Sequence, residues 1–159
     1  MIRRANPVVR RIADDRFELV LSPENRQGML SLLGELDDLL ESAPDDPSLR
    51  RLHPTAYHDD AERDAAYQLL AGEELRASRR ATIDAVQTSL AKPQLTRDEL
   101  WSWLRALNAL RLVVGTRLDI TDDDHSRPRR RRDDPDGPLW SAYEFATQVQ
   151  YFVISALGD

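Results

Sequence analysis

The residues best placed to do chemistry are polar side chains that fall on otherwise apolar faces of predicted helices. When these helices are projected at about 100° per residue, three helices each place polar groups on an apolar face. The polar residues concerned are Glu74, Arg79, Asn108, Arg111 and Gln150. Burying an ionised or hydrogen-bonding group is costly unless it meets a partner. The sequence therefore predicts a buried polar network between the helices.

Of these residues, Arg111 most needs a hydrogen-bonding or charged partner, because its helix face otherwise consists of leucine and valine. The sequence predicts an acidic partner for its guanidinium, with Glu74 as first choice and Asp59 or Asp60 as second. Each aspartate could also cap the helix that follows it. We expect the network to be structural and to fix helix register. The alternative is a small-ligand or enzyme site built between the helices from the same Glu/Arg/Asn cluster.

Other candidate metal-binding or catalytic motifs are less convincing. The segment His53–Asp60 contains two histidines and two aspartates, but its spacing matches no established metal site. The sequence has no glycine-rich phosphate loop, serine elbow or paired-histidine helix motif. With no cysteine, disulfides, thiolate zinc sites, iron–sulfur clusters and thiol redox sensing are excluded. We expect a non-enzymatic protein with no catalytic residues, metal or cofactor.

Two features offer contact with a partner as an alternative to a purely structural role. Trp101 lies at the edge of the apolar stripe of its helix, so core packing is expected, and the alternative is that its indole reaches the surface and anchors an interface. An arginine run includes Arg129, Arg130, Arg131 and Arg132. Aspartates on both sides largely offset its charge, so we expect a solvated loop, and the alternative is a segment that contacts DNA or a partner protein.

The elements that position these residues are mainly helices. Periodicity and caps at Ser22, Asp59 or Asp60, and Thr96 predict helices at 23–42, 59–91, 96–115 and 139–157, with one short turn at 46–52. Two β-favouring runs at 8–12 and 17–21 predict a short N-terminal hairpin. We therefore expect a mainly α fold, a bundle of four to five helices, forming a single helical domain over 1–159. A mobile loop is expected at 119–137.

The predicted helix 59–91 carries two apolar faces. One face contains Tyr67, Leu70 and a series of alanines, and the other contains Ile83 and Val86. A helix with two apolar faces is expected to be central and to touch neighbours on both sides. Gly115 is expected to terminate the helix that begins at Thr96.

The charge and hydropathy of the chain limit its partners. A net charge of −6 disfavours nucleic acid and anionic membranes as ligands of the whole molecule. The segment 139–157 is the best membrane candidate, but it contains Glu144, Gln148 and Gln150, which are costly in hydrocarbon. The N-terminus lacks the apolar run of a signal peptide. We expect a cytoplasmic protein with no membrane partner.

Three stretches are similar to a known family. They are Arg51–Asp60 (RLHPTAYHDD), Trp103–Leu118 (WLRALNALRLVVGTRL) and Gln150 in a C-terminal helix. Together they resemble the actinobacterial AosR-like family, over nearly the whole chain. The resemblance implies a small, mostly helical cytoplasmic protein, labelled an oxidative-stress transcriptional regulator, and a gene neighbourhood with the Clp protease adaptor. The regulator label is associated with cysteine chemistry, which cannot transfer to a chain without cysteine.

These observations favour a non-enzymatic regulatory or protein-interaction module, with a role in transcription as the resemblance implies. We expect a protein partner from the transcription or Clp protease machinery, and a homodimer. One alternative is a regulator that binds DNA directly, since Leu95–Leu100 resembles the start of a DNA-binding helix pair. The other alternative is the small-ligand or enzyme site described above.

Overall fold

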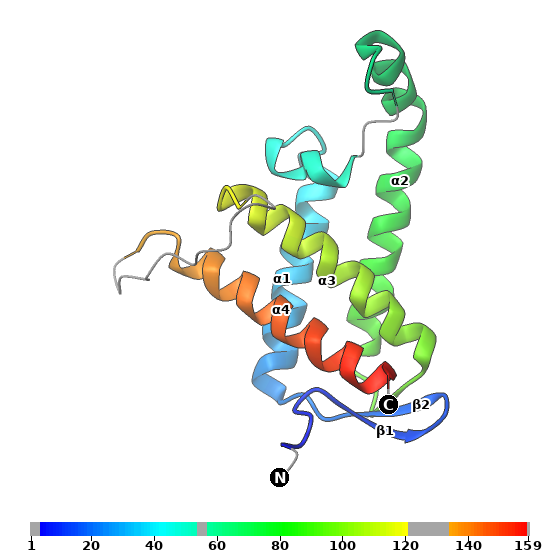
Figure 1. Cartoon of the computed structure of the whole chain (residues 1–159), viewed down its shortest axis with the longest axis vertical. Coiled ribbons are helices and arrows are strands. Elements are labelled where there is room, and N and C mark those ends of the chain that lie inside the picture. The colour runs from blue at the N-terminus through cyan, green and yellow to red at the C-terminus, as the bar shows by residue number, and fades with distance from the viewer. Residues whose placement is uncertain (1–3, 54–56, 121–133, 159) are drawn as a thin grey trace.

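The computed structural model describes residues 4–53, 57–120 and 134–158. Its elements are β1 (Val9–Ala13), β2 (Arg16–Leu19), α1 (Pro23–Ser42), the short 3₁₀ helix η1 (Pro47–Leu52), α2 (Ala61–Ser89), β3 (Gln94–Leu95), α3 (Arg97–Arg117) and α4 (Gly137–Gly158) (Figure 1). The mainly helical fold with an N-terminal hairpin is therefore confirmed. Most of the loop predicted at 119–137 lies outside the described residues.

The helix starts are set by local side-chain hydrogen bonds. The Ser22 hydroxyl accepts a bond from a backbone N–H of the first turn of α1, and Asp60 does the same for α2. At the start of α3, Thr96 and Glu99 form a reciprocal capping box. Because each cap depends only on neighbouring residues, the sequence predicted these starts to within two residues.

The hairpin continues into a third strand. β1 and β2 pair antiparallel with a bulge near Arg11 and Ala13, and β3 adds to β2 by pairing Leu95 with Phe17. This strand was not predicted, since two residues carry no recognisable period. It brings the start of α3 against the hairpin, where the guanidinium of Arg97 donates to the carbonyls of Asp14 and Leu157 at 3.1 Å each.

The central element is α3. It packs against α4, η1, α2 and α1, and it has the longest series of buried residues of any helix. Trp103 lies at the centre of this core, and its indole N–H donates to Ser89 at 2.8 Å. α2 was predicted to be central and to touch neighbours on both sides. It does contact α3 and α1, but it is not the central helix, because only its last third contains buried residues, at Ile83, Val86 and Ser89.

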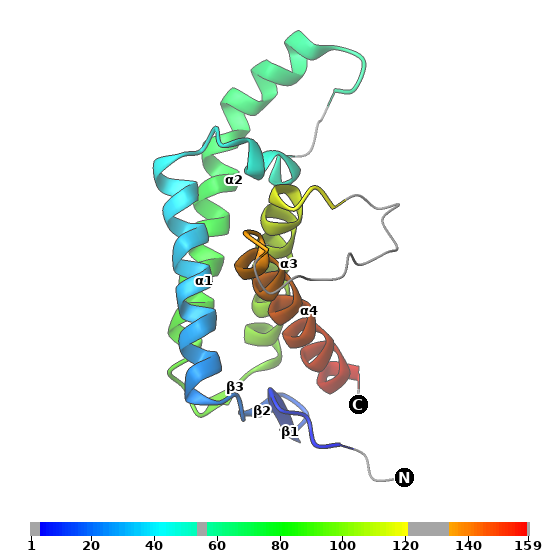
Figure 2. The ribbon, with the colours of Figure 1, turned by 90° about the vertical axis from the view of Figure 1, so that its left-hand side faces the viewer.

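The N-terminal part of α2 projects beyond the other helices. At 29 residues α2 is about 44 Å long, and its N-terminal end extends past η1 and the C-terminal end of α1 (Figures 1 and 2). None of the residues from Ala61 to Thr82 is buried. α2 therefore consists of a packed C-terminal third and an exposed arm.

α3 ends later than expected. Gly115 remains helical and buried, and a Cβ built on it would lie 3.6 Å from the Tyr143 ring. That distance is an ordinary van der Waals contact, so the packing of α4 does not require a glycine here. Gly115 does not terminate α3. Asp119, at a φ of 58°, takes the left-handed conformation just after Arg117. None of the helices in the described part of the chain has the length and hydropathy that a membrane crossing needs.

Candidate functional site

The polar network expected around Arg111 exists, but with different members. The Arg111 guanidinium donates from Nη1 to Gln150 Oε1 at 2.8 Å and from Nη2 to the Tyr143 hydroxyl at 3.2 Å. It also lies 5.1 Å from the centre of the Tyr143 ring. Gln150 is buried and its amide donates to the Leu104 carbonyl at 3.3 Å. The network joins the charged Arg111 of α3 to neutral partners on α4.

Several residues assigned to this network lie elsewhere. Glu74, Asn108, Asp59 and Asp60 are all exposed, so the expectation that they are buried is wrong. Glu74 does not pair with Arg111. Arg111 is only half-buried, and neutral acceptors and a ring face meet its two terminal nitrogens, while its buried Nε has no hydrogen-bond partner. Asp60 does cap α2, as predicted.

Arg79 is separate from this network. It is half-buried on α2, and its Nη2 donates to the Leu52 carbonyl at 2.9 Å. A pocket of about 240 Å³ between α2 and α3 is lined by Arg79 but not by Glu74, Asn108 or Arg111. The structure therefore does not gather these residues into the one ligand or enzyme site that the sequence left open.

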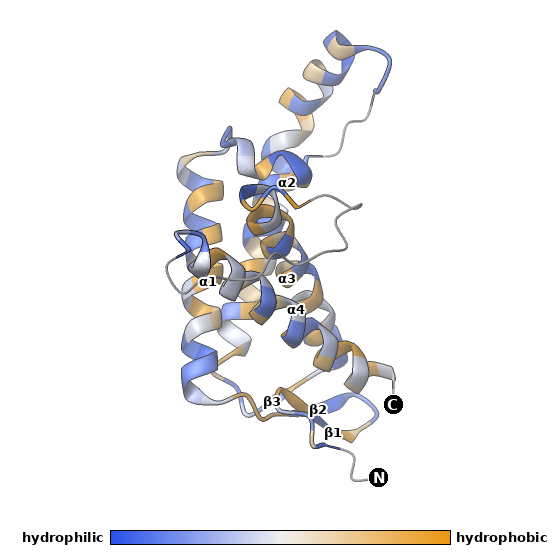
Figure 3. Cartoon of the chain, turned by 60° about the vertical axis from the view of Figure 1, so that its left-hand side comes forward, coloured by the Kyte–Doolittle hydropathy of each residue, from blue (hydrophilic) through white to orange (hydrophobic). Residues whose placement is uncertain are grey.

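An exposed apolar stripe runs along α2. Tyr67, Leu70, Ala77, Ala81 and Ala85 recur at helical spacing and are all exposed, with Leu70 at 85%. We call these five residues the α2 stripe; Glu74 projects into its middle. Figure 3 shows hydrophobic segments on the projecting part of α2. This is the face that the sequence predicted to be covered by a neighbouring helix, and within the described chain it is not covered.

A second apolar surface lies on the pair α3–α4. Trp101 is 49% exposed, Tyr151 66% and Ile154 59%. The bonds from Arg97 to the Leu157 carbonyl and from Gln150 to the Leu104 carbonyl set the antiparallel register of the two helices. In that register Trp101 and Ile154 lie at about the same height along the axes of the two helices. The predicted exposure of the Trp101 indole is observed, and its contact with a partner stays a prediction.

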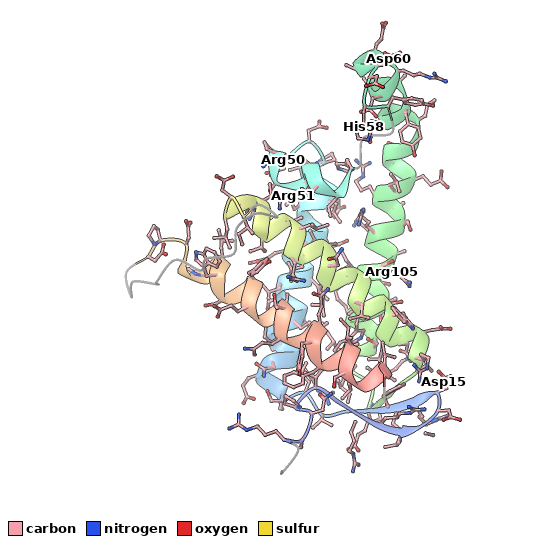
Figure 4. All side chains as sticks on the ribbon, viewed as in Figure 1. Asp15, Arg50, Arg51, His58, Asp60 and Arg105 are labelled. Carbon is pink, nitrogen blue, oxygen red and sulfur yellow. The ribbon has the colours of Figure 1, made fainter. Side chains whose placement is uncertain are left out.

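The predicted arginine contacts at Arg129, Arg130, Arg131 and Arg132 lie outside the described residues. The described basic residues of η1, Arg50 and Arg51, are exposed near the C-terminal end of α3 (Figure 4). Arg51 donates to the Ile120 carbonyl at 2.6 Å. It therefore holds the chain just after α3 against η1.

Acidic side chains gather on α1 at Asp37, Asp38 and Glu41, close enough together to share a cation. Arg80 of α2 offsets part of this charge, because it lies 2.9 Å from Asp37 and 3.2 Å from Glu41. This cluster was not singled out from the sequence. It ties α1 to the C-terminal half of α2, and exposed acidic groups of this kind are common without a metal ion.

Comparison with known proteins gives one family and one relative. The model of the family described as "Domain of unknown function (DUF2017)" matches residues 5–157. A protein of Mycobacterium leprae (strain TN), provisionally named oxidative stress regulator AosR, is 29% identical over 134 residues. The match covers 72% of this chain but only 59% of the relative. No solved structure matches the chain. Since the family model covers almost the whole sequence, the chain belongs to the DUF2017 family, as its resemblance to AosR-like proteins indicated.

Proposed function

We propose that this chain is a non-enzymatic regulatory protein that binds a protein partner through the α2 stripe. The observation that carries the proposal is the exposure of Leu70, at 85%, on a helical arm without one buried residue from Ala61 to Thr82. The name of the M. leprae relative supports a regulatory role.

An uncovered helical arm of this length needs a physical explanation. Helices in proteins owe most of their stability to packing of an apolar face, and isolated helices are marginal in water. The arm has such a face, with Tyr67 and Leu70 at its outer end, and it lies open to solvent. Exposed apolar patches of this kind on folded proteins mark interaction sites. A bound partner would supply the missing packing.

The stripe also indicates the chemistry of the partner. Ala77, Ala81 and Ala85 have short side chains, which permit close approach of another helix. Tyr67 and Leu70 precede them at the spacing of helix-in-groove anchors. Glu74 calls for a basic residue opposite it. The fitting partner is therefore an amphipathic helix with a small or apolar face and one cation, on a protein of the transcription or Clp protease machinery or on a second copy of this chain.

Two matched substitutions test the proposal. Leu70→Glu places a charge on the stripe, and Ile154→Glu places the same charge on the α3–α4 surface, where Ile154 is 59% exposed. Both positions are exposed, so both variants should fold with little loss of stability. Complexes formed by the tagged chain in its native cells are then compared by mass spectrometry and by light scattering. The proposal expects Leu70→Glu to lose a specific protein or the dimer, and Ile154→Glu to retain it. If Ile154→Glu loses the complex and Leu70→Glu retains it, the interface lies on the α3–α4 surface and the proposal is wrong.

Direct DNA binding has weaker support. Seven residues, 90–96, separate α2 from α3, and they include strand β3. A helix-turn-helix uses a turn of about three to four residues. The first turn of α3 also carries Asp98 and Glu99, which would repel phosphates. The described elements therefore do not support Leu95–Leu100 as the start of a recognition helix.

A further inference from the structure

The pocket between α2 and α3 is lined by residues that belong neither to the α2 stripe nor to the Arg111 network. Its volume is about 240 Å³. Apolar side chains, among them Leu75 and Ile83, line part of it, and the polar lining is supplied by Ser78, Arg79, Thr82 and Arg105. Two arginines thus enter one small pocket from two different helices, and no acidic residue is part of the lining.

Arg79 is incompletely satisfied there. Its Nη2 bonds to the Leu52 carbonyl, but its Nε is buried and has no hydrogen-bond partner. Within the described ranges no carboxylate forms an ion pair with it. Burial accordingly lowers the pKa of Arg79. A cation that loses solvent without gaining an anion is costly, and an anion entering the pocket would offset that cost.

Arg105 supplies a second cation to the same pocket. It lies on α3 where that helix crosses α2 (Figure 4). Its side chain is exposed, and Nη2 donates to the Ser102 hydroxyl at 3.1 Å. That bond engages one guanidinium nitrogen, and Arg105 has no ion pair among the described residues. Arginine has five N–H donors, so most of them remain free for a ligand.

We propose that this pocket binds a small organic anion, with one carboxylate or phosphoryl group held between Arg79 and Arg105. The Ser78 hydroxyl can donate a further hydrogen bond to the anion, whereas the Thr82 hydroxyl already donates to the Ser78 carbonyl at 3.1 Å. Leu75 and Ile83 can pack against a compact apolar group of the ligand. Guanidinium groups bind carboxylates and phosphates through paired, charge-assisted hydrogen bonds. The volume suits a ligand smaller than a typical drug. Although the chain has a net charge of −6, the two arginines would make the potential in this pocket positive and so attract an anion.

The site is independent of the proposed partner interface. Leu75, Arg79 and Ile83 lie on the face of α2 that turns towards α3, whereas the α2 stripe lies on the other apolar face. A bound anion would join α2 to α3 at the point where α2 leaves the packed body. The proposal therefore survives if the partner interface lies elsewhere.

The test uses the full chain with two probes, phenyl phosphate and benzoate, titrated by calorimetry at low ionic strength. Amide resonances of residues 75–83 and 105–109 report the location of binding. Arg79→Gln and Arg105→Gln each remove one cation of the pocket. Arg16→Gln removes one exposed cation at the sheet, where Arg16 bonds to Gln94, and leaves the same net charge as the other two variants. Because Arg105 is exposed, its variant should fold even if Arg79→Gln is destabilised.

We expect saturable binding of at least one probe, with shifts confined to 75–83 and 105–109. Each pocket variant should weaken it about tenfold or more, and Arg16→Gln should change it little. Preference for one probe identifies a phosphoryl or a carboxylate ligand. The proposal is overturned if neither probe binds saturably to the unaltered chain. It is also overturned if Arg16→Gln weakens binding as much as Arg105→Gln, because the effect would then be general charge attraction.

Discussion

Arg111 of α3 and Gln150 of α4 are joined by a hydrogen bond of 2.8 Å from Nη1 to Oε1. Gln150 is buried and also donates to the Leu104 carbonyl, so both ends of its amide are occupied by α3. Sliding α4 along α3 would break these bonds together. The pair therefore fixes the register of the two helices, and with it the level at which Trp101 and Ile154 meet the surface.

Removing the guanidinium should destabilise the fold moderately. Arg111→Ala leaves the buried Gln150 oxygen without its donor, which typically costs about 1–3 kcal/mol. Urea denaturation monitored by circular dichroism measures the free energy of unfolding. A double variant with Gln150→Leu and Arg111→Met removes both polar groups. Its loss of unfolding free energy should be smaller than the sum of the losses in the single variants Gln150→Leu and Arg111→Met. Additive losses would show that the pair is not coupled.

Arg111 also shows which structural property the helical period cannot predict. The helical period placed Arg111 and Gln150 each on an inward-facing apolar stripe, but it did not pair them, and Glu74 of α2 was predicted as the partner of Arg111 in place of Gln150 of α4. The acidic partner was inferred from full burial, but the period gives the direction of a side chain and not the depth of cover above it. The same applies to Tyr67 and Leu70. Their apolar face could be read from the sequence, but whether another helix covers it depends on how the elements pack.

The bond between Trp103 and Ser89 should be a second sensitive point. Ser89 accepts from the indole at 2.8 Å and donates to the Val86 carbonyl at 2.7 Å, and both side chains are buried. Ser89→Ala leaves the indole N–H without a partner, with an expected loss of about 1–3 kcal/mol in unfolding free energy. In a Trp103→Phe background the same substitution should cost clearly less. An equal cost in both backgrounds would show that the bond contributes nothing measurable.

Arg26 should be required in a way that lysine cannot replace. Its guanidinium donates to three carbonyls, those of Leu21, Leu90 and Leu19, at 3.0–3.1 Å. It thereby ties the start of α1 to β2 and to the C-terminal end of α2. Arg26→Lys keeps the charge but has a different donor geometry, so thermal unfolding should show most of the loss caused by Arg26→Ala. Full retention of stability in Arg26→Lys would indicate that charge alone matters.

His53 should make stability depend on pH. The pKa of His53 lies below its ordinary value of 6.5, because burial disfavours the imidazolium and Arg79 and Arg76 repel it. The unfolded chain therefore takes up this proton at a higher pH than the folded chain. Stability is fully present above about pH 6.5 and falls as the pH drops through the lowered folded pKa. His53→Gln should flatten the pH dependence of unfolding free energy between pH 7 and 5. An unchanged slope would contradict the lowered pKa.

The elements that the sequence predicted well are those set by short-range chemistry. The caps at Ser22 and Thr96 are satisfied within one helical turn, so the helix starts could be read directly. Strand β3 and the bond from Arg26 to the Leu90 carbonyl join residues far apart along the chain, so no local sequence pattern predicts them. The pocket at Arg79 and Arg105 belongs to the same class, since it exists only where α2 and α3 cross.

A photo-crosslinking footprint along α2 in native cells shows directly whether the α2 stripe is the interface. A photoreactive amino acid is placed singly at Leu70, Ala77 and Ala81 on the α2 stripe, and at the exposed off-stripe positions Glu62 and Glu73. If the α2 stripe is the interface, one protein species, or a second copy of this chain, crosslinks at the three stripe positions and not at the other two. Crosslinking of equal strength at all five positions, or none at the stripe, would show that the α2 stripe is not the interface.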